Sequence, residues 1–197
     1  MPRKIEIVVY EFAELDIKVQ EKVLEKFRHV NIEYDQDWHQ PIVEDFDVDM
    51  ANWGLSVDVR FSGFGSQGDG ASFTTDTCDT DLLIRKLYES GHDISETALL
   101  DSKQISVSIG SNDNHYAHEY TMNTFVYDED DILSSEEQED LTKVIDEWAR
   151  TKARELYKNL EKYYDELTSD DEVMEYFSNN DFMFLENGKV AAWDGII

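Results

Sequence analysis

A segment without glycine or proline, from Ser134 to Leu167, constrains the fold of this chain more than any other feature. Apolar side chains recur along it near the helical period: Leu141, Ile145, Trp148, Leu156, Leu160, Tyr163 and Leu167. Ser134 stands three residues before Glu137, which is the spacing of a helix N-terminal capping box. The segment therefore predicts one helix near residues 135–168, about 50 Å long at roughly 1.5 Å per residue.

Shorter periodic segments flank this helix. Alternating apolar residues predict strands over residues 4–10, 55–64, 71–75, 104–110 and 116–127, with turns at 66–70 and 111–114. Apolar residues at helical spacing behind capping residues predict helices over residues 16–30, 35–53, 82–90 and 169–178. Asn187-Gly188 lies between two short apolar runs and predicts a β-hairpin near the C-terminus.

These elements together predict an α+β fold with an antiparallel meander, helices packed on one face, one long helix and a C-terminal β-hairpin. The length suits a single domain over residues 1–197, in which residues 134–197 could form a helical and hairpin appendage. No apolar run is long enough to span a membrane. The single cysteine, Cys78, cannot form an intramolecular disulfide, which is expected of a protein in a reducing cytosol.

The acidic residues are concentrated in tracts that contain no Lys or Arg. The chain has 45 acidic and 17 basic residues, for a formal net charge of −28. Residues 29–59, 104–142 and 163–188 hold eight, ten and eight of these carboxylates. Clustered charge of one sign builds a directed field that repels nucleic acid and anionic membranes and attracts basic protein surfaces. We therefore expect no direct binding to nucleic acid and no membrane association, while the oligomeric state is not encoded in any pattern that we can identify.

Double-stranded DNA presents about one charge per 1.7 Å of its axis, so an acidic surface of this kind could occupy a basic DNA-binding groove. The carboxylates that would form such a partner-binding surface are Asp45, Asp47, Asp49, Asp128, Glu129, Asp130, Asp131, Glu136, Glu137, Asp140, Asp170, Asp171 and Glu172. A second interpretation stays open. The chain could be a non-catalytic interaction protein, or an antitoxin-like regulator, whose charge serves only solubility.

The glycine-rich segment from Gly63 to Gly70 does not fit a phosphate-binding loop. Such a loop leads into a helix and usually carries a lysine, whereas this segment leads into a strand pattern and lacks a base. We expect a structural turn in which Gln67 and Asp69 bond to the loop backbone, with a small-ligand or peptide site as the alternative.

No other residue group favours catalysis or metal binding. His115 and His118 fall on opposite faces of the predicted strand, so they converge poorly on one ion. Asp76, Asp79 and Asp81 fit helix capping better than a calcium loop, because the glycine and the closing glutamate are missing. The sequence thus predicts no catalytic residue, no metal and no cofactor, and a protein that is not an enzyme.

Two groups of residues resemble small, mostly uncharacterised proteins encoded by tailed bacteriophages. The more specific one is the string FSGFGSQGDGASF, from Phe61 to Phe73. The second group comprises residues 4–7, 20–28, 38 and 44–46, with a C-terminal part at 167–171, 180–181, 184 and 188–189. This resemblance carries no assigned chemistry.

The resemblance implies a phage origin and action in the cytoplasm of an infected bacterium. Phages encode many small acidic proteins that disarm nucleic-acid-binding enzymes of the host. The resemblance therefore implies an inhibitor of a host restriction, CRISPR-type or DNA-processing protein, whose basic groove would be the binding partner of the acidic surface.

Overall fold

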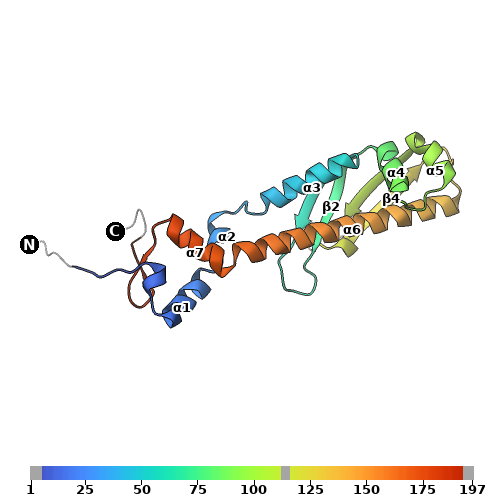
Figure 1. Cartoon of the computed structure of the whole chain (residues 1–197). Helices are drawn as coiled ribbons and strands as arrows, with labels where there is room; N and C mark the ends of the chain where they lie inside the picture. Colours follow the sequence, from blue (N-terminus) through green and yellow to red (C-terminus); the bar gives the residue numbers. More distant parts are fainter. Residues whose placement is uncertain (1–5, 112–115, 193–197) are drawn as a thin grey trace, which may run out of the picture. The chain divides into compact units, whose positions relative to one another are not determined.

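The computed structural model describes residues 6–111 and 116–192, and these form two compact units (Figure 1). Unit 1 consists of residues 1–39 and 162–197, and unit 2 consists of residues 40–161. The elements of unit 1 are η1 (Phe12–Glu14), α1 (Ile17–Phe27), α2 (Val30–Tyr34), α7 (Asp170–Asn179), β5 (Met183–Phe184) and β6 (Val190–Ala192). Those of unit 2 are α3 (Gln40–Asn52), β1 (Leu55–Phe61), β2 (Ala71–Cys78), α4 (Thr80–Glu89), α5 (Glu96–Leu100), η2 (Ser102–Gln104), β3 (Ile105–Ser111), η3 (Glu119–Thr121) and β4 (Met122–Asp128).

The long helix α6 (Ser135–Leu167) contributes residues to both units, and its prediction from the sequence is confirmed. Its start is fixed by the expected capping box. The Ser134 hydroxyl accepts the Glu137 N–H at 3.3 Å, and the Glu137 carboxylate accepts the Ser134 N–H at 2.9 Å. Leu141, Ile145 and Leu160 are buried at helical spacing along one side.

The strands of unit 2 form two antiparallel ribbons, β1–β2 and β3–β4, rather than the single meander expected from the sequence. β2 and β3 are neighbours without a backbone ladder between them. Instead, the Thr75 hydroxyl accepts the Ile109 N–H at 2.9 Å and donates to the Ile109 carbonyl at 3.3 Å. Asp76 is left out of the β1–β2 register, and such a bulge bends a strand and interrupts ladder pairing. The α+β class is confirmed.

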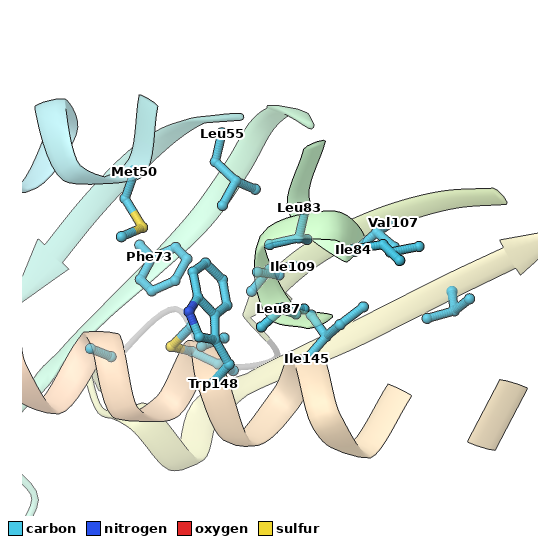
Figure 2. Close-up of a cluster of buried hydrophobic side chains, with 14 of the residues drawn as sticks. Met50, Leu55, Phe73, Leu83, Ile84, Leu87, Val107, Ile109, Ile145 and Trp148 are labelled. Carbon is cyan, nitrogen blue, oxygen red and sulfur yellow. The ribbon is translucent and has the colours of Figure 1, made fainter. Parts of the chain in front are cut away.

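The core of unit 2 lies between these ribbons and helices α3, α4 and α6. Figure 2 shows side chains from strands and helices pointing toward one another around Trp148 of α6. Leu83, Ile84 and Leu87 of α4 and Ile145 of α6 are fully buried there. Burying an aliphatic side chain stabilises a fold by about 1.5–3 kcal/mol, so this cluster holds the ribbons against the helices.

The core of unit 1 combines aliphatic side chains of Leu and Val with a cluster of phenylalanine rings. The Phe177 ring of α7 lies 5.3 Å from Phe12, 5.4 Å from Phe27 and 5.3 Å from Phe184, between ring centroids. The predicted C-terminal hairpin is confirmed as β5–β6, with Gly188 at φ +79° in its turn.

The predicted strand over residues 4–10 is wrong for the part that the structure describes. Only Tyr10 pairs, through two 2.8 Å backbone hydrogen bonds with Phe184. β5 is only two residues long. The chain turns directly after it, and the Leu185 N–H donates to the Lys189 carbonyl. No strand is therefore left opposite residues 6–9, and residues 4 and 5 lie outside the described residues.

Several further elements differ from the sequence prediction. β4 begins at Met122 rather than Tyr116, because His118 caps a short 3-10 turn before it. The helix expected over residues 35–53 begins only at Gln40. The short helix α5, capped by Ser95, was not predicted. Of the turn expected at 111–114, residues 112–114 lie outside the described part of the chain.

Candidate partner-binding surface

Hydrogen bonds at both ends hold the backbone that carries the acidic residues between β4 and α6. One oxygen of the Asp128 carboxylate accepts the Leu133 N–H at 2.6 Å, and Leu133 is buried in the core of unit 2. The loop between them is thereby closed at both ends. We call Asp128–Asp131, with Glu136, Glu137 and Asp140 of the first turns of α6, the acidic corner.

The first turn of α6 is tied both to the loop and to β4. Hydrogen bonds from the Ser134 backbone and hydroxyl lower the pKa of Glu137 to about 2, and the hydroxyls of Thr97 and Ser95 act in the same direction. The Gln138 side-chain amide donates to the Val126 carbonyl of β4 at 2.9 Å. The position of the acidic corner is therefore set by several independent contacts.

Within the acidic corner, Glu129, Asp130, Asp131 and Glu136 are exposed and form no ion pair with any described residue. Asp131 adopts φ 53°, a left-handed conformation that Asp tolerates better than most residues. The second oxygen of Asp128 is buried and has no hydrogen-bond donor among the described residues. Most of the acidic corner therefore carries negative charge that no described residue neutralises through an ion pair.

Other predicted residues of the surface have structural partners. Asp140 lies 3.4 Å from the Lys143 ammonium, and Asp49 lies 2.9 Å from the Lys152 ammonium. Both carboxylates are partly neutralised by these contacts. They are weaker candidates for binding a partner than the unpaired residues of the acidic corner.

Helix α3 presents a second, smaller acidic patch. Asp45 and Asp47 are exposed on it, whereas Phe46 and Met50 are buried. Desolvation, followed by the nearby charge of Glu44, raises the pKa of Asp47.

The acidic residues at the start of α7 belong to unit 1. The Asp170 carboxylate lies 3.4 Å from the Arg28 guanidinium. The Ser169 hydroxyl accepts the Glu172 N–H at 3.3 Å and so caps the helix. Asp171 is exposed, and Asp170, Asp171 and Glu172 occupy the first turn, where negative charge is favourable because of the helix dipole. The structure thus gives this group a local role in unit 1.

The glycine-rich segment forms a turn between β1 and β2. Asp69 bonds to the loop backbone, as expected, by accepting the Ser66 N–H at 2.7 Å. Gln67 is exposed and makes no hydrogen bond with a described residue. Gly65 and Gly68 have positive φ, and a Cβ at Gly70 would lie 2.8 Å from the His118 ring. These contacts support a structural turn, with Gln67 as the side chain available to a ligand.

The Phe64 ring holds this turn against α6. It stacks on Tyr157 at 5.5 Å between centroids, and the Tyr157 hydroxyl donates to the Gly63 carbonyl at 3.1 Å. The aromatic residues of the FSGFGSQGDGASF string therefore have packing roles.

Within residues 6–111 and 116–192, no group of three His, Cys, Asp or Glu side chains could hold a metal ion. His118 contacts the Glu119 carboxylate at 3.1 Å, while His115 lies outside the described residues. Asp79 caps α4 by accepting the Leu82 N–H at 3.1 Å, and burial raises the pKa of the Cys78 thiol.

None of the described helices is both long and apolar enough to cross a bilayer.

An exposed aromatic pair, Phe125 and Tyr127, lies on β4 and was not predicted from the sequence. Alternation with the buried residues Thr124 and Val126 was the available signal, since it places both rings on the outer side of the ribbon.

The family model described as "Domain of unknown function (DUF8835)" matches residues 38–170 of this chain. Because the match covers more than half of the sequence, the chain belongs to this family. No curated protein matches the chain, and no solved structure matches it.

Proposed function

We propose that this member of the DUF8835 family is a non-catalytic binding protein whose acidic corner occludes a basic, nucleic-acid-binding groove of another protein. In line with the phage resemblance, the partner would be a host defence or DNA-processing protein in the bacterial cytoplasm. The proposal includes no catalytic step, no cofactor and no direct contact with nucleic acid.

One observation carries this proposal. The exposed carboxylates Glu129, Asp130, Asp131 and Glu136 have no basic partner among the described residues, yet the backbone that bears them is fixed by the Asp128 and Ser134 contacts. A fixed array of uncompensated charge loses little conformational entropy on binding. It also accelerates encounter with an oppositely charged groove.

A pull-down from bacterial lysate with the full chain tests the proposal. We expect it to recover a DNA-binding protein that competing DNA and raised salt displace, because exposed charges are screened beyond about 8 Å at physiological ionic strength. The variant carrying E129Q, D130N, D131N and E136Q should bind that protein about 10- to 100-fold more weakly, since exposed ion pairs contribute roughly 0.2–1 kcal/mol each.

This variant leaves Asp128 and Glu137 intact, so the loop and the helix cap should still form. A matched control carries E21Q, E33Q, D165N and E166Q, which removes the same charge from exposed carboxylates of unit 1. Equal loss of binding in both variants would contradict a localised site. Unchanged binding in the first variant, with little salt dependence, would contradict occlusion by the acidic corner.

A second candidate function is favoured by the neutralised carboxylates. The pairs Asp49–Lys152, Asp140–Lys143 and Asp170–Arg28 show that part of the acidity serves the fold. An interaction or antitoxin-like regulatory protein, whose remaining charge serves solubility, would have this property. A recovered partner without a basic groove would support it.

A further inference from the structure

The outer side of the β3–β4 ribbon carries two exposed aromatic rings. Phe125 is 44% exposed and Tyr127 is 53% exposed, and their rings lie 6.4 Å apart at an interplanar angle of 20°. The residues between and before them, Val126 and Thr124, are buried on the opposite side. The two rings therefore add little to the core of unit 2.

Small residues of β3 stand opposite these rings. Ser106 pairs with Tyr127 and Ser108 with Phe125 across the ribbon. Cross-strand neighbours of this size cannot cover the faces of Phe and Tyr rings. We call Phe125, Tyr127, Ser106 and Ser108 the aromatic face.

The aromatic face adjoins uncompensated negative charge. The chain passes directly from Tyr127 into the acidic corner, and residues 104–142 contain no Lys or Arg. An occupant must therefore offer a flat group for the rings and positive charge for the carboxylates. An arginine guanidinium does both, since it stacks on aromatic faces and pairs with carboxylates through two parallel hydrogen bonds.

A lysine ammonium would satisfy the charge but stacks less well, because it is a compact and strongly hydrated point charge. A nucleobase would stack on the rings, but its phosphates would be repelled by the adjacent carboxylates. The chemistry of the two neighbouring surfaces thus favours arginine over both alternatives.

We propose that the aromatic face, together with the acidic corner, binds an arginine-rich segment of a protein partner and selects arginine over lysine. This inference rests on the proposed function, because it names the chemistry of the groove that the acidic corner occupies. Phe125 and Tyr127 provide the selection, and the carboxylates provide the attraction.

Nona-arginine and nona-lysine peptides of equal charge test this selection, with binding to the full chain measured by calorimetry at physiological salt. We expect nona-arginine to bind about 5- to 30-fold more tightly, as two exposed cation–π contacts would give. The variant with F125S and Y127S should lose the part of this preference that stacking provides, with its affinity for nona-lysine little changed.

Two further variants keep the test decisive. F125L with Y127L retains apolar bulk but removes the aromatic faces, and it should also lose the arginine preference. Y34S with Y88S removes two exposed rings elsewhere, 61% and 51% exposed, and should keep the preference.

The outcomes separate this inference from the proposed function. Equal binding of both peptides by the wild-type chain would overturn the aromatic selection, and so would a preference that survives undiminished in both ring-removing variants. If E129Q, D130N, D131N and E136Q together still weaken both peptides in that case, the acidic corner stands. Absence of salt-dependent binding to either peptide would overturn both proposals. Binding of single-stranded oligothymidylate that is lost with F125S and Y127S would assign the rings to nucleic acid instead.

Discussion

Phenylalanine rings around Phe177 make up a much larger share of the core of unit 1 than aromatic rings do of the core of unit 2, which is mainly aliphatic. Unit 1 is assembled from both ends of the chain, and unit 2 from the continuous stretch of residues 40–161. The smaller unit has short helices and a β-hairpin of a few residues, so it has few positions that can be buried. Rings bury the largest area per residue, which explains why a unit with few core positions relies on them.

The same comparison holds for the contacts that join elements. In unit 2 a threonine hydroxyl links two ribbons, and many buried aliphatic side chains contribute to the core. In unit 1 a few close contacts fix the hairpin: Tyr10 bonds to Phe184, and Gly188 packs against α1. We therefore expect single substitutions to damage unit 1 more severely and more locally than unit 2.

The largest effect should come from Phe177→Ala. Removing a fully buried ring that contacts Phe12, Phe27 and Phe184 should lower the free energy of unfolding by about 3–5 kcal/mol. Hydrogen exchange should accelerate mainly in α7 and β5, with β3 amides protected longer. Equal acceleration of exchange in both units would contradict the expectation that damage to unit 1 stays local. Tyr88→Ala, at an exposed ring of unit 2, is the control.

Gly188→Ala should have the next largest effect. Its φ is +79°, and an added Cβ would lie 2.8 Å from the side chains of Val19 and Val23. Gly91 of unit 2 has a similar φ of +89° but open space around it. Gly91→Ala should cost only the left-handed strain of about 1–2 kcal/mol. Gly188→Ala should cost roughly 1–3 kcal/mol more, because it also overpacks α1. Urea unfolding of the two variants measures this difference. Equal losses in the free energy of unfolding would show that α1 shifts to accommodate the added Cβ without destabilising the fold.

Thr75→Val should destabilise unit 2 by about 1–3 kcal/mol, because it preserves the shape of the side chain but leaves the Ile109 N–H and carbonyl without their partner. Thr77→Val on the same strand, at an exposed position, should be nearly neutral. Thermal unfolding with exchange of the Ile109 amide provides the measurement. If the Ile109 amide still exchanged slowly in Thr75→Val, the two ribbons would be held together without the threonine bridge.

The smallest effect concerns the N-terminal caps of α6 and α7. Because the pKa of Glu137 falls from an ordinary 4.5 to about 2 on folding, its ionised form stabilises the native state above pH 4.5. That stabilisation should disappear as the pH falls toward 2. The melting-temperature difference between wild type and Glu137→Gln should therefore shrink between pH 5 and pH 2.

Glu172→Gln in α7 is the matched variant for this titration. Only the Ser169 hydroxyl bond is made there, and no return bond from the Glu172 carboxylate to a described residue is present. Its melting-temperature difference should vary less with pH. The same pH dependence in both variants would mean that the dipole, rather than the reciprocal cap, controls these glutamates.

Local patterns in the sequence predicted the features that are decided within a few residues. Asp16, Asp79, Ser134 and Ser169 cap helices where expected, because each side chain reaches a backbone N–H two or three residues ahead. The strands β1 and β3, with their alternating apolar residues, and the Asn187-Gly188 turn could be predicted for the same reason. The exposure of the carboxylates after Tyr127 could also be predicted, since burying a turn with several unpaired charges would be strongly unfavourable.

The tertiary structure alone decided which of the acidic residues keep their charge uncompensated. Asp49 meets Lys152 across 103 positions of sequence, and Asp170 meets Arg28, so neither pairing has a local signal. The Thr75 bridge to Ile109 and the exposure of Phe125 and Tyr127 likewise depend on which strand lies beside which. The sequence by itself determined the helices, turns and overall negative charge, because these depend on neighbouring residues. Packing of distant segments determined the partners of each charge and the uncovered rings, because only burial and proximity in space settle them.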